Sequence, residues 1–503
     1  MSNLLFDSLF QRHDGEAKPF LIFADGSKQS YNSFLRQTAR FANTIRSLGL
    51  SAGDRLIVQI EKSAESLAVY AACVQSGVIF LPLNTAYTPS EVSYFIADSG
   101  AKLVIADKSF NLSLVAKRHG VILEYLDANG NGSFMDRAKK ESDQFKTVAR
   151  GSDDLAALLY TSGTTGRSKG AMLTHKNLLS NAETLLNDWC FDESDVLLHA
   201  LPIFHTHGLF VATNIILLAK ATMIFLPKFS TDSVIEFIPK STSMMGVPTF
   251  YTRLLDDPEF TKDLTSHMRL FISGSAPLLA ETHLQFEKRT GHRILERYGM
   301  TETNMNSSNP YNGERRAGTV GKPLSGVEIK ITNSDTGQIL TDGEIGQIEV
   351  RGPNVFVGYW NMPDKTREEL RDNGFFITGD LGRIDEFGYL QIVGRNKDLI
   401  ISGGYNIYPK EIELVLDEQK SVLESAVIGV PHPDFGETAI GILVSVNGQK
   451  IDLETIEKTL HEKLARFKQP RKLVVVDSLP RNTMGKVQKN ILRSEFSSIL
   501  ENQ

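Results

Sequence analysis

A run of glycine, hydroxyl and lysine residues lies between residues 160 and 170, where the sequence reads Tyr-Thr-Ser-Gly-Thr-Thr-Gly-Arg-Ser-Lys-Gly. Glycine lets the backbone approach an anion closely and adopt positive φ angles. Backbone N–H groups, the hydroxyl groups of residues 161–165 and the Lys169 ammonium can together bind phosphate oxygens. An apolar strand is expected at 155–160 and would hold such a loop in place. The segment therefore predicts a polyphosphate-binding site.

The phosphate-binding loop of nucleotide hydrolases is the obvious alternative, with the pattern Gly-x4-Gly-Lys-Ser/Thr. Counted from Gly163, its second glycine would fall at Ser168, so the pattern is absent. A helix should also follow such a loop directly. Here residues 171–173 are apolar, and Thr174 has the character of the N-cap of a later helix. A mobile glycine–serine turn without a ligand is the remaining alternative.

Later blocks also bring together residue types suited to nucleotide chemistry. They are 297–303 (Arg-Tyr-Gly-Met-Thr-Glu-Thr), 377–380 (Ile-Thr-Gly-Asp), 394–398 (Gly-Arg-Asn-Lys-Asp) and 480–486 (Pro-Arg-Asn-Thr-Met-Gly-Lys). Taken singly, their polar residues have ordinary interpretations. Glu302 and Lys486 would be solvated charges, and Asp380 with Arg395 would form a surface ion pair.

In type and order, these blocks and the loop at 160–170 resemble the signatures of the adenylate-forming superfamily, which comprises acyl-CoA synthetases, peptide-synthetase adenylation domains and luciferases. The resemblance covers nearly the whole chain. It implies an enzyme that uses ATP and Mg²⁺ to activate a carboxylic acid as an acyl-adenylate. The ATP-binding residues that it implies are Thr161, Ser162, Gly163, Thr164, Thr165, Gly166, Lys169, Ser275, Ala276, Pro277, Tyr298, Gly299, Thr301, Asp380, Arg395 and Lys486.

The same resemblance implies individual roles for some of these residues. Glu302 and Thr161 would hold Mg²⁺, a cation that takes oxygen ligands, and with Lys486 they form the implied catalytic set. Asp380 would accept hydrogen bonds from the ribose, and Arg395 would reach the sugar or a phosphate. Lys486 would bridge the substrate carboxylate and the α-phosphate and stabilise the charge of the transition state.

The C-terminal part of superfamily members rotates between two states, one for each half of the reaction. In this sequence Lys397 occupies the hinge position, and the implied pantetheine channel is lined by Ser402, Gly403 and Gly404. No carrier module follows Gln503, so free coenzyme A is the expected acceptor. A stand-alone enzyme that loads a carrier protein is the alternative.

Arg297 stands where many relatives have a glycine before the Tyr-Gly of this block. A guanidinium in an acyl pocket suits a second carboxylate, which arginine can bind through two hydrogen bonds. The alternative is an arginine paired with Glu296 or another local acid. The wider acyl-pocket blocks resemble those of bacterial malonyl-CoA synthetases; they are 201–210, 245–251, 271–279 and 296–306.

This second resemblance implies that Arg297 binds the distal carboxylate of malonate, assisted by His205 and Ser273. Thr206 and Met305 would limit bulk at the C2 carbon. We therefore expect a malonate–CoA ligase with methylmalonate as a slower substrate. The alternatives are a ligase for another short or aromatic acid and a non-catalytic ATP-binding protein.

The expected elements indicate an α/β protein. Up to about residue 300, apolar runs such as 56–60, 78–83 and 103–106 alternate with helical patterns such as 64–75, which is typical of doubly wound sheets. After Val320 the strands alternate apolar with polar residues, which predicts an antiparallel, β-barrel-like part. We expect a large N-terminal domain at 1–394, a hinge at 395–398 and a small, mobile α+β domain at 399–503.

The composition excludes other classes of protein. The net charge is −6, from 54 basic and 60 acidic residues without a basic stripe, which argues against nucleic acid as a partner. The apolar window 208–226 contains Lys220 and predicts buried core, so no membrane partner is expected. Two cysteines and no signal-like N-terminus indicate a cytoplasmic protein. A lysine acetyltransferase that neutralises Lys486 is a partner to be tested.

Overall fold

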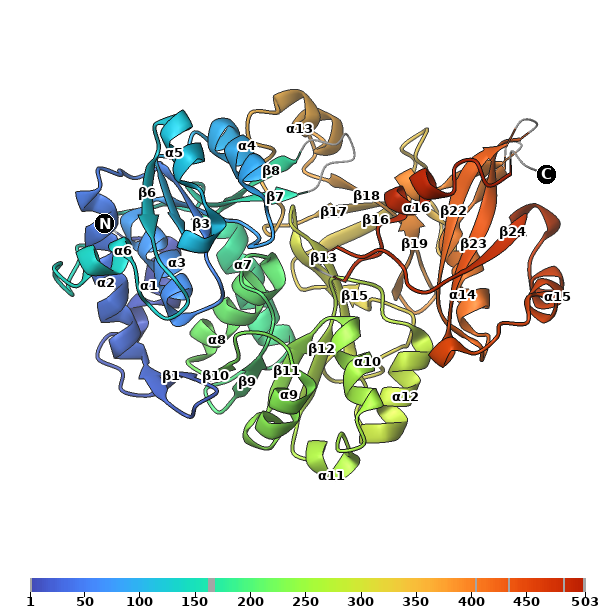
Figure 1. Ribbon diagram of the computed structural model, residues 1–503, viewed down its shortest axis with the longest axis horizontal. Coiled ribbons are helices and arrows are strands. Elements are labelled where there is room, and N and C mark those ends of the chain that lie inside the picture. The colour runs from blue at the N-terminus through green and yellow to red at the C-terminus, as the bar shows by residue number, and fades with distance from the viewer. Residues whose placement is uncertain (1, 162–167, 403–404, 433–434, 483–484, 501–503) are drawn as a thin grey trace. The chain divides into compact units, whose positions relative to one another are not determined.

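The computed structural model describes residues 2–161, 168–402, 405–432, 435–482 and 485–500 (Figure 1). Their packing divides the chain into two compact units. Unit 1 comprises Met1–Arg316, Gly321–Glu328 and Val350–Phe376, and unit 2 comprises Ala317–Val320, Ile329–Glu349 and Ile377–Gln503. Residues 377–394 thus pack with the C-terminal part, whereas the expected large domain ran to residue 394. A hinge at 395–398 concerns motion and stays a prediction.

The first sheet of unit 1 has six strands in the described residues, in the order β6-β5-β3-β4-β7-β8. Their bounds are β3 Arg55–Gln59, β4 Ile79–Pro82, β5 Leu103–Ala106, β6 Ile122–Tyr125, β7 Leu155–Thr161 and β8 Lys169–Thr174. All neighbours are parallel except β7 and β8. Helix α3, Ala64–Ser76, follows β3, and all its side chains except Glu65 are buried. The expected doubly wound architecture is confirmed for this part.

Strands β7 and β8 form an antiparallel hairpin that pairs Thr161 with Lys169 at its tip. Thr174 caps helix α7, His175–Asp188, by accepting a hydrogen bond from the Asn177 N–H. The prediction that no helix follows the glycine-rich loop directly, and that Thr174 caps the next helix, is therefore confirmed; strand β8 lies between them. The expected phosphate-binding residues Ser162, Gly163, Thr164, Thr165 and Gly166 lie outside the described residues.

The second sheet of unit 1 has nine strands in the described residues, in the order β15-β14-β13-β12-β11-β9-β10-β1-β2. Their bounds are β1 Pro19–Ile22, β2 Lys28–Ser30, β9 Val196–His199, β10 Thr222–Phe225, β11 Ser243–Gly246, β12 Leu270–Ser273, β13 Leu295–Met300, β14 Asn304–Ser308 and β15 Lys322–Pro323. The six strands from β13 to β1 are parallel. The segments that follow β9, β12 and β13 therefore meet at one edge of the sheet, where open α/β sheets bind ligands.

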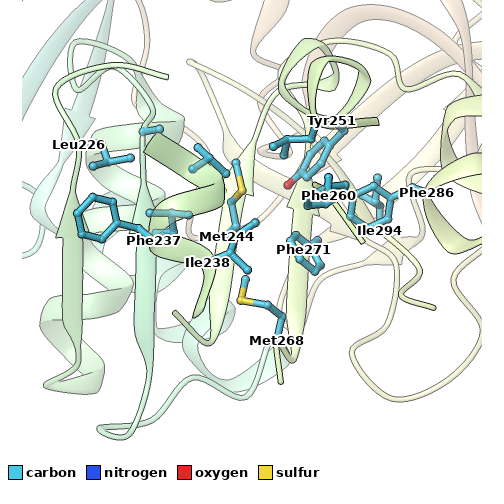
Figure 2. Packing of buried hydrophobic residues seen from close by; sticks show 14 of the residues in the cluster. Leu226, Phe237, Ile238, Met244, Tyr251, Phe260, Met268, Phe271, Phe286 and Ile294 are labelled. Atoms are coloured by element: carbon cyan, nitrogen blue, oxygen red, sulfur yellow. The ribbon is translucent and has the colours of Figure 1, made fainter. Parts of the chain in front are cut away.

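An aromatic cluster fixes this edge from one face of the sheet (Figure 2). Tyr251 on α10, Pro248–Asp256, meets Phe286 edge-on with ring centroids 5.4 Å apart. Phe271 on β12 meets the same ring at 5.1 Å. The buried Tyr251 hydroxyl donates to the Ile272 carbonyl at 2.6 Å, so its polar end is satisfied. The end of β12 is thereby held rigidly.

The remaining helices of unit 1 surround these sheets (Figure 1). They are α1 Leu4–Leu9, α2 Tyr31–Ser47, α4 Pro89–Ser99, α5 Ser113–His119, α6 Ser133–Ala138, α8 Asn214–Ala219, α9 Thr231–Phe237, α11 Lys262–Thr265, α12 Ala280–Thr290 and α13 Pro363–Glu369. A π-helix at His207–Thr213 leads into α8, and the side chains of both are buried, as expected for 208–226. Among the described residues, no helix is long and apolar enough to cross a membrane.

Unit 2 contains most of a four-stranded sheet, β16-β17-β18-β19, where the sequence predicted a β-barrel-like part. A mixed sheet, β21-β20-β23-β22 with β24 beside β23, packs with helices α14, α15 and α16, so the expected small α+β domain is confirmed. The bounds are β16 Glu328–Thr332, β17 Gly346–Arg351, β18 Phe376–Ile384, β19 Leu390–Arg395, β20 Ile400–Ser402, β21 Tyr405–Ile407, α14 Pro409–Asp417, β22 Val422–His432, β23 Gly436–Ser445, α15 Leu453–Lys463, β24 Lys472–Val476 and α16 Lys489–Glu495.

Candidate active site

In unit 1, the lysine of the glycine-rich loop lies among carboxylates. The Lys169 Nζ atom is 3.3 Å from Glu369 Oε1 and 4.3 Å from the centre of the Tyr359 ring. The Tyr359 hydroxyl lies 2.7 Å from Glu369 Oε2 and 3.1 Å from Glu302 Oε1. Thr161 Oγ1 lies 3.5 Å from the same Glu302 oxygen. The structure thus brings together Thr161 and Lys169 of the 160–170 loop with Glu302 of the distant 297–303 block.

The turn between β13 and β14 presents Glu302. Gly299 is required there, because a Cβ atom would lie 1.9 Å from the Asn304 carbonyl oxygen. Tyr298 is buried within β13, and Thr301 is half-buried in the turn itself. This tight hairpin gives the buried Glu302 carboxylate a fixed position near β7.

The oxygen atoms at this position fit Mg²⁺. The buried Glu302 carboxylate, from the β13–β14 turn, and the Thr161 hydroxyl, at the end of β7, lie close together, and Mg²⁺ prefers one or two protein oxygens together with water and substrate phosphates. Within the described ranges, no cluster of three His, Cys, Asp or Glu side chains is suited to a metal. Glu302 and Thr161 would hold a Mg²⁺ ion whose remaining positions are filled by water and nucleotide phosphates.

The segment after β12 lies against Arg297. Ser275 adopts φ +71°, a left-handed conformation that is rare for a residue with a side chain. Its neighbours Ala276 and Pro277, which the resemblance assigns to ATP binding, are half-buried and exposed, respectively. Gly274 leaves room for the guanidinium, since a Cβ atom there would lie 2.5 Å from Arg297 Cζ.

Arg297 is 3% exposed, and no carboxylate forms an ion pair with it among the described residues. Its Nη2 atom lies 3.4 Å from Ser275 Oγ, and its Nε–H has no acceptor in the part of the chain that the structure describes. Burial lowers the pKa of Arg297 to about 9, although Tyr251 and Glu296 favour the charged form. The alternative of an Arg297–Glu296 pair is not observed, and Glu296 instead accepts a hydrogen bond from the Leu278 N–H.

His207 is the histidine that joins this cluster. Its Nδ1 atom lies 3.2 Å from Ser275 Oγ, and its Nε2 atom has no hydrogen-bond partner among the residues described. Burial and the Arg297 charge hold the pKa of His207 well below its usual value, so the ring is neutral. The sequence favoured His205, whose pKa burial lowers to about 4 and whose ring packs on Phe204. His207 lies in the same block, 201–210, but nothing in the sequence distinguishes the two histidines.

Three other predicted acyl-site residues are buried, as Arg297 is. Ser273 and Thr206 are buried, and their hydroxyl groups have no hydrogen-bond partner within the described ranges; Met305 is buried with its methyl group close to Gly299. A buried polar group left unsatisfied costs about 1–3 kcal/mol. Among the described residues, the polar atoms of this region that have no partner include His205 Nε2, Thr206 Oγ1, His207 Nε2, Ser273 Oγ, Arg297 Nε, Asn304 Nδ2, Asn304 Oδ1 and Asn306 Nδ2. A polar ligand would satisfy several of them.

A buried lysine, which the sequence did not single out, anchors the loop that carries these histidines. Lys62 Nζ lies 2.8 Å from both the Nδ1 atom and the carbonyl oxygen of His199, and His199 Nε2 lies 2.8 Å from the Gly208 carbonyl. Burial holds the pKa values of Lys62 and His199 well below their usual range. These contacts tie the start and the end of the 200–208 loop together.

In unit 2, Asp380 and Arg395 face each other across β18 and β19, with Arg395 Nε 2.8 Å from Asp380 Oδ1. Asp380 is buried, so this is not the surface ion pair that was the alternative. Lys397 is exposed in a short 3₁₀ turn, Asn396–Asp398, directly after β19. Ser402 ends β20 opposite Tyr405, and Gly403 and Gly404 lie outside the described residues.

Lys486 is exposed as a residue, but the protein atoms around its ammonium lower its pKa to about 8, and the Arg395 charge acts in the same direction. Asp380 opposes this shift. The predicted adenylation lysine therefore lies within electrostatic range of the predicted ribose-binding pair. Each of these roles remains a prediction.

The lowered pKa of Lys486 predicts a pH dependence. The ammonium is present below about pH 8 and is lost above it, so a step that needs the cation should slow as the pH rises past that value. We expect an alkaline limb near pH 8 in kcat/KM for ATP–pyrophosphate exchange. The Lys486→Arg variant is the control, because arginine stays protonated and its residual activity should lack this limb. The same limb in both proteins would assign it to another group.

Comparisons with known proteins agree with this geometry. A model of the AMP-binding enzyme family matches residues 10–360, and a model of the AMP-binding enzyme C-terminal domain matches residues 411–486. The malonate–CoA ligase of Arabidopsis thaliana is 34% identical over 99% of this chain and 89% of that protein. The long-chain-fatty-acid–CoA ligase of Bacillus subtilis is 32% identical over 98% of this chain and 94% of that protein.

A solved structure is more similar. ATP-bound MatB from Rhodopseudomonas palustris is 54% identical, with a TM-score of 0.97, over 99% of this chain and 100% of that chain. The two ligases above match at nearly equal identity although their names give different acids. Overall similarity at that level therefore does not select the acid, and the pocket residues must do so.

Proposed function

The chain belongs to the AMP-binding enzyme family, and on that premise we propose that it is a malonate–CoA ligase. The enzyme converts malonate, ATP and coenzyme A into malonyl-CoA, AMP and pyrophosphate. A malonate carboxylate oxygen attacks the α-phosphorus, and the bond to pyrophosphate breaks. The thiol sulfur of coenzyme A then attacks the carbonyl carbon of malonyl-adenylate, and AMP leaves.

The side chains divide this work between them. Lys169 and the 161–166 loop bind the phosphates that leave, and Glu302 with Thr161 holds the Mg²⁺ that neutralises their charge. Asp380 accepts hydrogen bonds from the ribose hydroxyl groups, with Arg395 beside it. Lys486 stabilises the charge that develops between the carboxylate and the α-phosphate.

The single observation that carries the choice of malonate is the buried Arg297 guanidinium without an ion-pair partner in the described residues. A buried charge is costly unless it is paired. The second carboxylate of malonate supplies that pair, and an oxygen next to the unsatisfied Nε–H and Ser275 completes the hydrogen bonds. A ligase for a monocarboxylic acid has no use for this cation.

Thr206 and Met305 limit the space at the C2 carbon, so methylmalonate is the slower substrate in this proposal. The hinge at Lys397 and a pantetheine channel at Ser402, Gly403 and Gly404 belong to the second half of the reaction. The cytoplasmic location and the acetylation of Lys486 are further predictions from the sequence. Mass spectrometry of the protein from growing cells tests the latter.

A substrate panel tests the proposed function. The wild-type enzyme is given ATP, Mg²⁺ and coenzyme A with malonate, methylmalonate, acetate, butyrate or benzoate, and AMP and the thioester are measured. We expect kcat/KM for malonate to exceed that for each monocarboxylic acid by about 10²-fold or more, the scale of one charge-assisted contact pair. Preference for butyrate or benzoate would refute the malonate assignment. Product that forms only with a carrier protein would refute the coenzyme A step.

A further inference from the structure

The cation meant for the leaving phosphates is already occupied. Lys169 is 8% exposed, and its ammonium lies 3.3 and 3.4 Å from the two carboxylate oxygens of Glu369. No sequence motif predicted this partner, which lies 200 residues away in the chain. The pair occupies the position at which the proposed function requires phosphate oxygens.

Glu369 is held there by more than Lys169. The Tyr359 hydroxyl lies 2.7 Å from Oε2, and Lys365 Nζ lies 3.0 Å from Oε1. Burial alone would raise the pKa of Glu369, but Tyr359 and the two lysines lower it, so the group is an anion. Glu369 is also the last residue of α13, where the helix dipole disfavours a negative charge. The contacts around the carboxylate, not the helix, therefore keep it in place.

Tyr359 extends the arrangement to the proposed Mg²⁺ ligand. Its hydroxyl has one proton, and the shorter distance, 2.7 Å to Glu369 against 3.1 Å to Glu302, places that proton on the Glu369 side. If Glu369 moves away, the same proton becomes available to Glu302. An anion that replaces Glu369 at Lys169 thus also changes the hydrogen bonding of Glu302.

We propose that Glu369 is a built-in competitor of polyphosphate, which occupies Lys169 in the nucleotide-free enzyme and is displaced by the β- and γ-phosphates of ATP. The proposal rests on the proposed function, since it takes ATP as the ligand. Because Glu369 must first be displaced, it weakens the binding of every ligand whose phosphates reach Lys169. AMP lacks those phosphates, so its binding is unaffected. The return of Glu369 then favours the release of pyrophosphate over that of the adenylate.

Equilibrium binding tests this directly. Isothermal titration calorimetry with ATP, pyrophosphate and AMP at fixed Mg²⁺ is applied to wild type, Glu369→Gln and the control Glu368→Gln. Glu368 is the adjacent carboxylate; its side chain is 65% exposed, and among the described residues its ion-pair partner is Lys365. We expect Glu369→Gln to bind ATP and pyrophosphate about tenfold more tightly, the scale of one charge-assisted contact. Its AMP affinity and all affinities of Glu368→Gln should equal those of the wild type.

The alternative role, in which Glu369 orients Lys169 for the phosphates, predicts the opposite sign. Weaker or unchanged ATP binding by Glu369→Gln would overturn the proposal. Lys169→Met supplies a second test, because Glu369→Gln should then change ATP affinity less than twofold if the two residues act as a pair. A tenfold change in that background would also overturn it. A wild-type protein that binds no ATP would refute the proposed function itself.

Discussion

The Lys486→Ala variant is expected to lose adenylation by about 10²- to 10³-fold while it retains the thioester half of the reaction. The ammonium is proposed to stabilise charge that exists only in the first transition state, and removal of one such group typically costs a factor of this size. In the second half, malonyl-adenylate is already formed and the thiol attacks a carbonyl carbon. ATP–pyrophosphate exchange measures the first half, and thioester formation from supplied malonyl-adenylate measures the second.

The folded state should tolerate this change. Lys486 is exposed as a residue, and its ammonium has a lowered rather than a raised pKa, so no carboxylate dominates its surroundings. Exposed substitutions of this kind usually change stability by less than about 0.5 kcal/mol. Lys458→Ala, at an exposed position on α15, is the control and should keep both half-reactions. Equal losses in both halves for Lys486→Ala would exclude a specific role in adenylation.

The elements of the fold follow largely from local patterns in the sequence. Strand β5 begins and ends at the residues that its apolar run predicts, and Thr174 caps α7 as its hydroxyl suggests. Buried parallel strands are continuous apolar runs bounded by polar turns, so their ends are visible in the sequence. These local patterns do not show which elements pack together. Residues 329–349 and 377–394 pack with the C-terminal part, although their sequence shows only a change from continuous apolar runs to alternating apolar and polar residues.

The candidate site could be predicted only where the residues stand in recognisable blocks. Asp380 and Arg395 meet as expected because β18 and β19 are neighbours in an antiparallel pair. Glu369 could not be found, because its partner is 200 residues away and nothing local marks it. An ion pair between Arg297 and Glu296 is disfavoured by the strand itself, because the two residues are adjacent in β13 and adjacent side chains in a strand point to opposite faces.

The buried cation at Arg297 leads to a prediction in which activity and stability separate. Arg297→Met should lower kcat/KM for malonate by about 30-fold to several thousand-fold, because removing one member of a buried charge pair costs about 2–5 kcal/mol. Acetate turnover should change much less, since acetate has no second carboxylate. The ratio of malonate to acetate turnover, measured by consumption of the coenzyme A thiol, is therefore the informative quantity.

Without substrate, the Arg297→Met variant should be at least as stable as the wild-type protein. In the free enzyme Arg297 bears the cost of a buried charge with an unsatisfied Nε–H, and methionine of similar length removes both. Arg315→Met provides the opposite case, because Arg315 donates to the carbonyl oxygens of Pro310, Tyr311 and Arg293. We expect Arg315→Met to lower the thermal unfolding temperature and to keep the malonate preference. A cation held for the substrate predicts that Arg297→Met loses the malonate preference but keeps its stability. If Arg297→Met were instead destabilised as strongly as Arg315→Met and still preferred malonate, Arg297 would be a structural residue.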